Sequence, residues 1–285
     1  MNKIVTALII LASLIGKAQN ENSLLWKIEG NGLKTPSYLF GTIHATCSNE
    51  LKITKRIKTA LDASQQLVLE TDMDEPDFMT RLEQGSVNPS MKNISTELSE
   101  KDLKIVNEFF KINYGADMSQ LGIVKPFALM SMILMKYFKC SQPESYEAEL
   151  MEYAKKHSWR VLGLEEVEVQ TSFMDEVSLK QQFTWVVNYI LEKEAISKSI
   201  EKTILAYKKE DIFELNKLFD LYPEYITLKG SILDKRNESW IPNIEKFASE
   251  KPTLFAVGAG HLAGDKGIIN LLITRGYKVT PIYKN

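Results

Sequence analysis

The sequence predicts an α/β fold, in which a central sheet is built from strand–helix–strand (βαβ) units at the N- and C-terminal ends and is flanked by helices. Two observations favour this fold. Strand-like apolar runs gather near the two ends of the chain, and long stretches of helical periodicity lie between them. Because the two ends are expected to pair in one sheet around large helical insertions, we expect residues 19–285 to form a single domain.

The N-terminal unit is expected to follow a first strand over residues 24–28. A second apolar run covers residues 38–43, and a third covers residues 67–70. Between the second and third runs, apolar side chains recur at helical spacing over residues 50–63. This order predicts strand, helix and strand.

The C-terminal unit repeats that plan. Residues 253–257 read as a strand, Asp265 is a good helix N-cap, Gly276 ends that helix, and residues 278–283 form a closing strand. One further strand is expected mid-chain, over residues 160–164. The remaining segments predict helices, over residues 99–113, 126–138, 144–157, 179–196, 200–208, 211–219 and 237–249.

The overall composition narrows the class of protein. The chain has 285 residues, of which 44% are hydrophobic and 25% charged, as in ordinary globular proteins. Its net charge is -2, and no Lys/Arg cluster interleaves with aromatic residues, so we expect no nucleic-acid partner. The mean hydropathy of -0.17 excludes a polytopic membrane protein.

The first 18 residues read as a secretory signal peptide, with a cut before Gln19. A short basic start is followed by an apolar run and then by Gly16-Lys17-Ala18, which places small residues at a cleavage site. The apolar run of about 12 residues is short for a membrane span, although an uncleaved anchor is the alternative. We therefore expect an exported protein, periplasmic or extracellular, with no transmembrane segment in the mature chain.

Two cysteines remain after the signal peptide, Cys47 and Cys140. An even number in an oxidising compartment favours a disulfide between them. It would close a loop of roughly 90 residues, worth about 4 kcal/mol of unfolding free energy in the chain-entropy model. Two alternatives stay open: a pair of free thiols, or Cys47 as a metal ligand beside His44.

Two similar turns carry the functional signal. Gly41-Thr42-Ile43-His44 and Gly258-Ala259-Gly260-His261 each follow a predicted strand and precede a helix. Parallel strands place ligand sites beyond their carboxyl ends, and glycine lets another group approach the backbone closely. Two such turns at equivalent places predict that His44 and His261 share one crevice. The third histidine, His157, is expected to be a solvated helix cap.

Two carboxylates are expected at the same edge, since Glu70 and Glu165 each end a predicted strand. Two imidazoles with one or two carboxylates suit a divalent ion such as Zn, Mn or Co. A metal-free pair of His and Glu acting as general acid and base is a second interpretation. A third has both histidines hydrogen-bonded to backbone within their turns. The single-helix HExxH zinc motif is absent.

At these residues the sequence resembles the TraB/GumN family, which also includes the Tiki metalloproteases. Six segments spread over the whole mature chain carry the resemblance: Leu25-Trp26-Lys27-Ile28-Glu29-Gly30, Ser37-Tyr38-Leu39-Phe40-Gly41-Thr42-Ile43-His44, Leu67-Val68-Leu69-Glu70-Thr71-Asp72, Gly163-Leu164-Glu165 with Gln170, Arg236-Asn237-Glu238-Ser239-Trp240, and Phe255-Ala256-Val257-Gly258-Ala259-Gly260-His261-Leu262.

The resemblance implies a fold like that of the erythromycin-esterase and ChaN-like proteins, and for Tiki members a divalent-metal-dependent peptidase activity. It implies that His44, Glu70 and His261 form the metal or catalytic set. It also implies that Glu165 and two further side chains, Gln170 and Arg236, support the pocket.

Arg236 has two interpretations. It is either part of a solvated helix face or an inward arginine that binds a substrate carboxylate or orients Glu165. Trp240 is expected to pack rather than to stack on a ligand.

Our leading hypothesis is a secreted metal-dependent hydrolase of peptidase-like type, acting on a peptide or another carbonyl-containing substrate. The alternative is a non-catalytic protein that binds a peptide or a haem-like ligand in the same cleft. The predicted site residues are as follows: catalytic Glu70, Glu165 and Arg236; pocket Gly41, Gly258, Gln170 and Asn237; metal ligands His44, His261 and Glu70 for Mn, Co or Zn.

Overall fold

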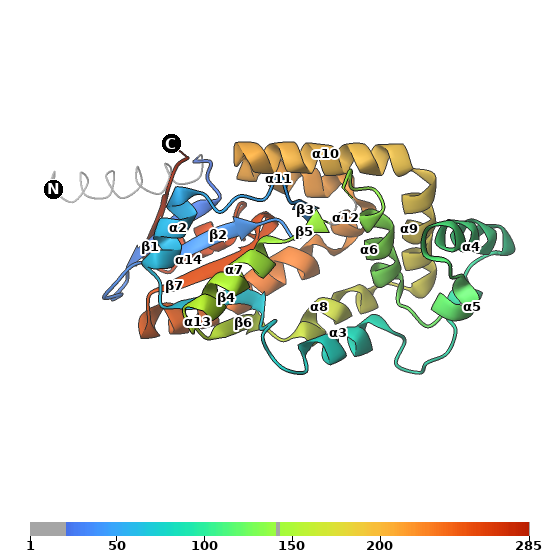
Figure 1. Ribbon diagram of the computed structural model, residues 1–285, viewed down its shortest axis with the longest axis horizontal. Coiled ribbons are helices and arrows are strands. Elements are labelled where there is room, and N and C mark those ends of the chain that lie inside the picture. Colours follow the sequence, from blue (N-terminus) through green and yellow to red (C-terminus); the bar gives the residue numbers. More distant parts are fainter. Residues whose placement is uncertain (1–20, 141–142, 285) are drawn as a thin grey trace, which may run out of the picture.

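The computed structural model describes residues 21–140 and 143–284, so the predicted signal peptide lies outside the described residues. The predicted α/β fold is confirmed: a mostly parallel six-stranded sheet is flanked by helices (Figure 1). The sheet order is β6-β4-β7-β2-β1-β8. Its strands are β1 (Leu25–Gly30), β2 (Ser37–Thr42), β4 (Gln66–Thr71), β6 (Val161–Glu165), β7 (Thr253–Gly258) and β8 (Tyr277–Pro281).

The two ends of the chain interleave in this sheet. β7, from the C-terminal unit, lies between β2 and β4 of the N-terminal unit and is parallel to both. In its register with β2, Thr42 faces Gly258, so the two Gly-x-x-His turns leave the sheet side by side. β1 is antiparallel to both of its neighbours, β2 and β8.

Helices occupy most of the remaining chain. Within the described residues they are α2 (Lys55–Asp62), α3 (Phe78–Ser86), α4 (Glu100–Tyr114), α5 (Met118–Leu121), α6 (Pro126–Met135), α7 (Tyr146–Lys156), α8 (Val167–Ser172), α9 (Leu179–Leu191), α10 (Lys193–Lys209), α11 (Ile212–Leu218), α12 (Pro223–Lys229), α13 (Lys235–Glu250) and α14 (Ile268–Thr274).

One helix differs from the prediction in a way that shapes the molecule. The segment predicted as a single helix over residues 179–196 breaks at Glu192. α9 packs on α4 and α6, whereas α10 packs on α11 and crosses the top of the molecule (Figure 1). Tertiary packing on two different sets of neighbours therefore overrides a continuous helical pattern.

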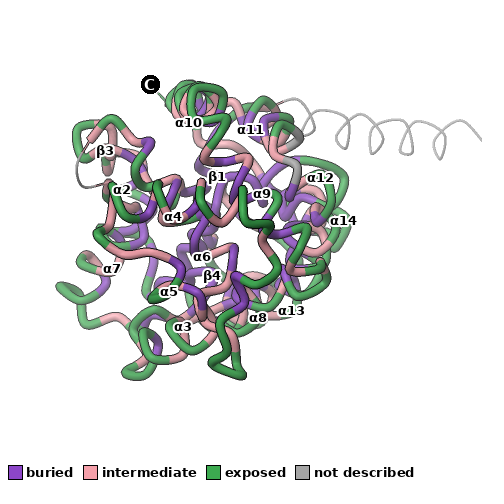
Figure 2. Tube along the Cα trace, turned by 90° about the vertical axis from the view of Figure 1, so that its right-hand side faces the viewer, coloured by how far each residue is buried: buried purple, intermediate pink, exposed green. Residues whose placement is uncertain are grey.

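The apolar core has two parts. One surrounds the sheet and includes Trp26, Phe255 and Trp240. The other lies among the helices beyond the sheet and includes Phe110 and Trp185. Seen from the helical end, buried backbone runs through the interior while the outer helical surfaces are exposed (Figure 2). The carboxyl ends of the parallel strands thus face a second, helical core, and the candidate site lies between the two.

The predicted disulfide between Cys47 and Cys140 is confirmed, with Cα atoms 5.8 Å apart. Next to it, β3 (Thr46–Cys47) pairs with β5 (Pro143–Glu144). The loop after β2 is thereby tethered to the start of α7. Because Cys47 is bonded to sulfur, the interpretation of Cys47 as a metal ligand is wrong. None of the helices in the described ranges is both long and apolar enough to cross a membrane.

Candidate functional site

The structure brings the two turn histidines to one carboxylate. Glu70 lies near the end of β4, His44 follows β2, and His261 ends the 3-10 turn after β7. Glu70 Oε1 is 3.6 Å from His44 Nε2 and 3.7 Å from His261 Nε2. The strand order explains this convergence, because β4, β7 and β2 are neighbours and end at the same edge.

Each imidazole ring also has a polar partner at Nδ1, the nitrogen that does not approach Glu70. His44 Nδ1 lies 2.9 Å from Glu147 Oε1, and His261 Nδ1 lies 2.6 Å from Asn237 Oδ1. The Asn237 amide nitrogen donates to the carbonyl of Lys266, which fixes its oxygen toward the ring. In the neutral form of each ring we therefore assign the proton to Nδ1, which leaves Nε2, the nitrogen nearer to Glu70 Oε1, as the unprotonated atom.

The two histidines differ sharply in environment. The His261 side chain is 5% exposed and packs against Trp240; burial and the charge of Arg236 lower its pKa to about 3. For His44, desolvation acts to lower the pKa, but the carboxylates of Glu147 and Glu70 outweigh it and raise the pKa to about 9. Since 63% of the His44 side chain is exposed, water screens part of that attraction.

Both carboxylate oxygens of Glu70 accept hydrogen bonds from the protein. Its Oε1 accepts a hydrogen bond from the Gly258 N–H at 2.7 Å. Its Oε2 accepts from Arg236 Nη2 at 2.7 Å and from Gln170 Nε2 at 3.1 Å. Burial acts to raise the pKa of Glu70, but Arg236 and the Gly258 hydrogen bond help to hold it well below its usual range. The carboxylate is therefore ionised and fixed in orientation.

Arg236 points inward, as the second interpretation of this residue expected, and its side chain is 9% exposed. It lies in the first turn of α13, which directly follows a π-helical turn, Gly230–Asp234. Its Nε and Nη2 donate to Glu165, and its Nη1 donates to the carbonyl of Ile232. Trp240 is fully buried, as expected of a packing residue, and its Nε1 donates to Glu165 Oε2 at 2.8 Å.

The two predicted pocket glycines do different things. A Cβ on Gly258 would lie 3.0 Å from His44 Nε2 and 3.2 Å from Glu70 Oε1, so only glycine leaves the space between these groups open. A Cβ on Gly41 would lie 2.6 Å from a methyl group of Leu262. Gly41 therefore lets the second turn pack against β2.

The family model described as TraB/PrgY/gumN matches residues 24–281. The chain belongs to the TraB/PrgY/gumN family. It is 21% identical over 313 aligned residues to "Metalloprotease TIKI2" of Danio rerio, in an alignment covering 90% of this chain and 60% of that protein. The chain thus spans less than two thirds of the length of that curated relative. No solved structure matches the chain significantly.

Sequence reasoning missed one member of the site in this TraB/PrgY/gumN chain, Glu147. The residue lies in the first turn of α7, and its Oε1 also accepts a hydrogen bond from Thr42 at 2.6 Å. A signal for it did exist. The predicted disulfide joins Cys47, three residues after His44, to Cys140, seven residues before Glu147. His157 lies outside the site: it caps α7 and stacks on Tyr153.

The fit of a metal ion can be tested on these contacts. Across residues 21–140 and 143–284, no group of three or more His, Cys, Asp or Glu side chains is set up as a metal site as it stands. The donor chemistry nonetheless suits one, since two Nε2 lone pairs face one carboxylate oxygen and second partners hold both rings. Ligand atoms around a tetrahedral zinc lie roughly 3.4 Å apart, and the observed separations are 3.6 and 3.7 Å.

Proposed function

We propose that this TraB/PrgY/gumN family member is an exported metal-dependent hydrolase of peptidase-like type, with His44, Glu70 and His261 as the metal ligands. The observation that carries the proposal is the approach of both Nε2 atoms to Glu70 Oε1. The similarity to a protein named a metalloprotease supports it. The Cys47–Cys140 disulfide is compatible with export, because disulfides persist in oxidising compartments.

A bound divalent ion would polarise a substrate carbonyl and lower the pKa of water. The chain's own residues prepare for that chemistry. Glu147 and Asn237 hold the two rings with Nε2 free. The Gly258 N–H fixes one oxygen of Glu70, and the same glycine leaves room for a reacting group. Glu147 also accepts a hydrogen bond from Thr42, which keeps the carboxylate in place behind the His44 ring.

Arg236 and Glu165 act in this proposal through other groups. Every nitrogen of the Arg236 guanidinium already contacts the protein, and Glu165 accepts from both Arg236 and Trp240. We therefore assign them as positioning residues, which hold Glu70 in place. Gln170 shares this task, since it donates to the same Glu70 oxygen as Arg236 does.

The second candidate function is a non-catalytic binding protein for a peptide or a haem-like ligand in the same cleft. Two observations favour it. Both Glu70 oxygens are hydrogen-bonded within the protein, and Arg236 Nη1 lies 3.4 Å from His261 Nε2, where its charge opposes a metal cation. The two functions differ in whether the purified protein takes up a metal ion.

The test is metal stoichiometry on folded protein. Wild type should take up one Mn, Co or Zn, and His44→Ala, Glu70→Ala and His261→Ala should each lose most of it, with folding checked by circular dichroism. Gly258→Ala should lose metal because its methyl group enters the space between the donors, whereas the matched control Gly230→Ala, which meets nothing within 4 Å, should not.

A metal-screened peptide-library assay then tests hydrolysis. No uptake by wild type, or unchanged uptake by either histidine variant, would contradict the shared site. A Soret band on adding haem, with no metal uptake, would favour the binding protein.

A further inference from the structure

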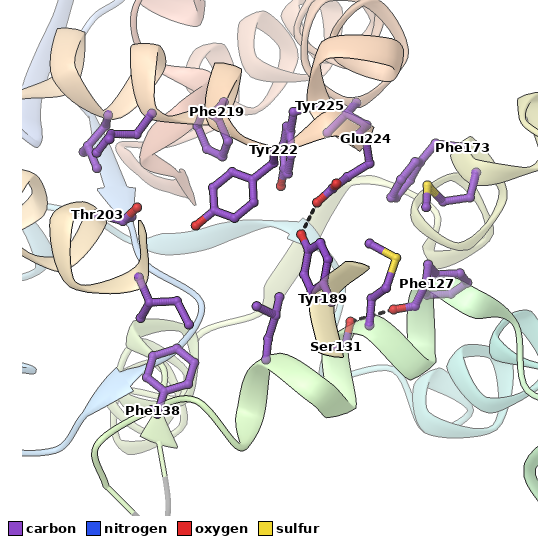
Figure 3. Close-up of a pocket in the computed structure, with 17 residues that line it drawn as sticks. Phe127, Ser131, Phe138, Phe173, Tyr189, Thr203, Phe219, Tyr222, Glu224 and Tyr225 are labelled. Carbon is purple, nitrogen blue, oxygen red and sulfur yellow. Dashed lines mark hydrogen bonds between the residues drawn. The ribbon is translucent and has the colours of Figure 1, made fainter. Parts of the chain in front are cut away.

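A cavity of about 280 Å³ lies in the helical core, next to the candidate site. Its walls are largely aromatic and apolar, and Figure 3 shows Phe219, Tyr222 and Tyr225 gathered on one side with Tyr189 opposite them. Apart from tyrosine hydroxyls and two small hydroxyl side chains, its one polar lining residue is Glu224. Cavities of this size and lining are typical of sites for small ligands or single side chains.

Glu224 is an unusual residue for such a wall. It is 5% exposed, and its Oε1 accepts a hydrogen bond from the Tyr189 hydroxyl (Figure 3). Its Oε2 is buried and has no hydrogen-bond partner among the described residues. A buried carboxylate oxygen without a donor costs free energy of folding, so a ligand that supplies a donor, once the Glu224 carboxyl turns toward the cavity, would gain the free energy of that missing bond.

The cavity and the candidate site share a wall. Ile232 lines the cavity, and its carbonyl accepts the hydrogen bond from Arg236 Nη1 at 3.0 Å. Phe219 also lines the cavity, and its ring lies against Gly260, the residue before His261: a Cβ on Gly260 would be 2.1 Å from that ring. Phe219 therefore lies between the cavity and the turn that carries His261.

We propose that this cavity receives a primary ammonium group on an apolar stem, as in the side chain of lysine. The aromatic walls suit both the methylene stem and, through their π faces, the cation. A single oxygen of Glu224 remains free, because Tyr189 occupies the other. One free oxygen matches a compact ammonium better than a guanidinium, which binds carboxylates through two parallel bonds.

The choice of a peptide as carrier of this group rests on the proposed function, but the binding test does not. The probes are two blocked peptides, acetyl-Ala-Ala-Lys-Ala-Ala-amide and its norleucine counterpart, which keeps the stem and lacks the amine. Binding is measured by calorimetry with a chelator present. We expect the lysine peptide to bind at least about tenfold more tightly, because its ammonium group can form a charge-assisted hydrogen bond that the norleucine side chain cannot form.

Glu224→Gln keeps the shape of the wall and removes the charge, so it should abolish the preference for lysine. Glu214→Gln, an exposed glutamate on the nearby α11, is the matched control and should keep it. Equal affinity of wild type for both peptides, no binding of either, or an unchanged preference in Glu224→Gln would overturn the cavity proposal.

These outcomes separate the two proposals. Hydrolysis without a lysine preference overturns only the cavity assignment. A lysine preference without metal uptake or hydrolysis supports the cavity and overturns the hydrolase.

Discussion

The two Gly-x-x-His turns look alike in sequence but place their histidines in opposite settings. His261 is buried against Trp240 and is held by the neutral amide of Asn237. His44 is 63% exposed and is held by the charged carboxylate of Glu147. The repeated motif thus fixes the direction of each imidazole ring, whereas the residue hydrogen-bonded to its Nδ1 influences whether the ring is charged.

This difference suggests a division of labour. A buried neutral ring with a fixed tautomer suits a permanent ligand, whereas an exposed ring paired with a carboxylate carries a second proton in the metal-free protein, which a metal ion must displace. Arg236 holds the surroundings of His261 in place, and the disulfide holds those of His44. Arg236 lies beside His261 and Glu70, and the disulfide ties the His44 turn to the helix that carries Glu147. Perturbing each in turn should affect one histidine more than the other.

The largest loss of stability is expected in the buried network around Arg236, which lies beside His261. Arg236→Ala would leave Glu70 and Glu165 buried without their countercharge, which commonly costs about 3–5 kcal/mol of unfolding free energy. Urea unfolding measures it. The matched control is Arg81→Ala, an arginine that also contacts three carboxylates but at the surface, and its loss should be much smaller. Equal losses in the two variants would place Arg236 outside the buried network.

The next largest loss of stability is expected from removing the disulfide that tethers the His44 turn. Replacing both cysteines, Cys47→Ser with Cys140→Ser, should cost about 2–4 kcal/mol of unfolding free energy, since the bridge closes a long loop. It should also broaden the NMR signals of the His44 ring while leaving those of His261 sharp. Thiol labelling of denatured, unreduced wild type should find no free thiol. Two labelled thiols, or equal broadening of both rings, would contradict this.

The third effect compares the histidines directly. His261→Ala removes a buried ring and leaves Asn237 Oδ1 without its donor, so we expect a loss of about 1–3 kcal/mol. His44→Ala removes an exposed ring, and Glu147 keeps its hydrogen bond from Thr42, so the loss should be smaller. Urea midpoints of the two metal-free variants decide the ranking. A reversed order would mean that exposure does not govern what each turn contributes.

Much of this site could be predicted from the sequence, because its signals are local. Two Gly-x-x-His turns, together with carboxylates at strand ends, predict one edge of a parallel sheet. Strong apolar runs also located every strand of the sheet to within about two residues, the usual uncertainty of element boundaries.

The rest depends on contacts between distant residues. Nothing in the sequence order places β7 between β2 and β4, since non-local pairing sets that arrangement. Glu147 lies on a helix about 100 residues from His44 and matches no motif. α3, α8 and α12 are short, and tertiary packing rather than periodicity stabilises such helices. Gly41 could not be distinguished from Gly258, because only the positions of Leu262 and His44 show what each glycine makes room for.

The smallest expected effect is the dependence of the His44–Glu147 pair on pH. The pKa of His44 is raised from 6.5 to about 9, so its charged form is favoured in the folded protein. Stability from this pair is therefore fully present below about pH 6.5 and is lost as the pH rises toward 9. Because the ring is largely exposed, we expect a change below about 1 kcal/mol, so the ring titration itself is the better measurement.

In NMR of metal-free protein with a chelator, His44 should titrate well above 6.5 and His261 should stay neutral throughout the neutral range. Glu147→Gln should lower the pKa of His44 and leave His261 unchanged. Coincident titration of both rings near 6.5 would remove the contrast between the two turns.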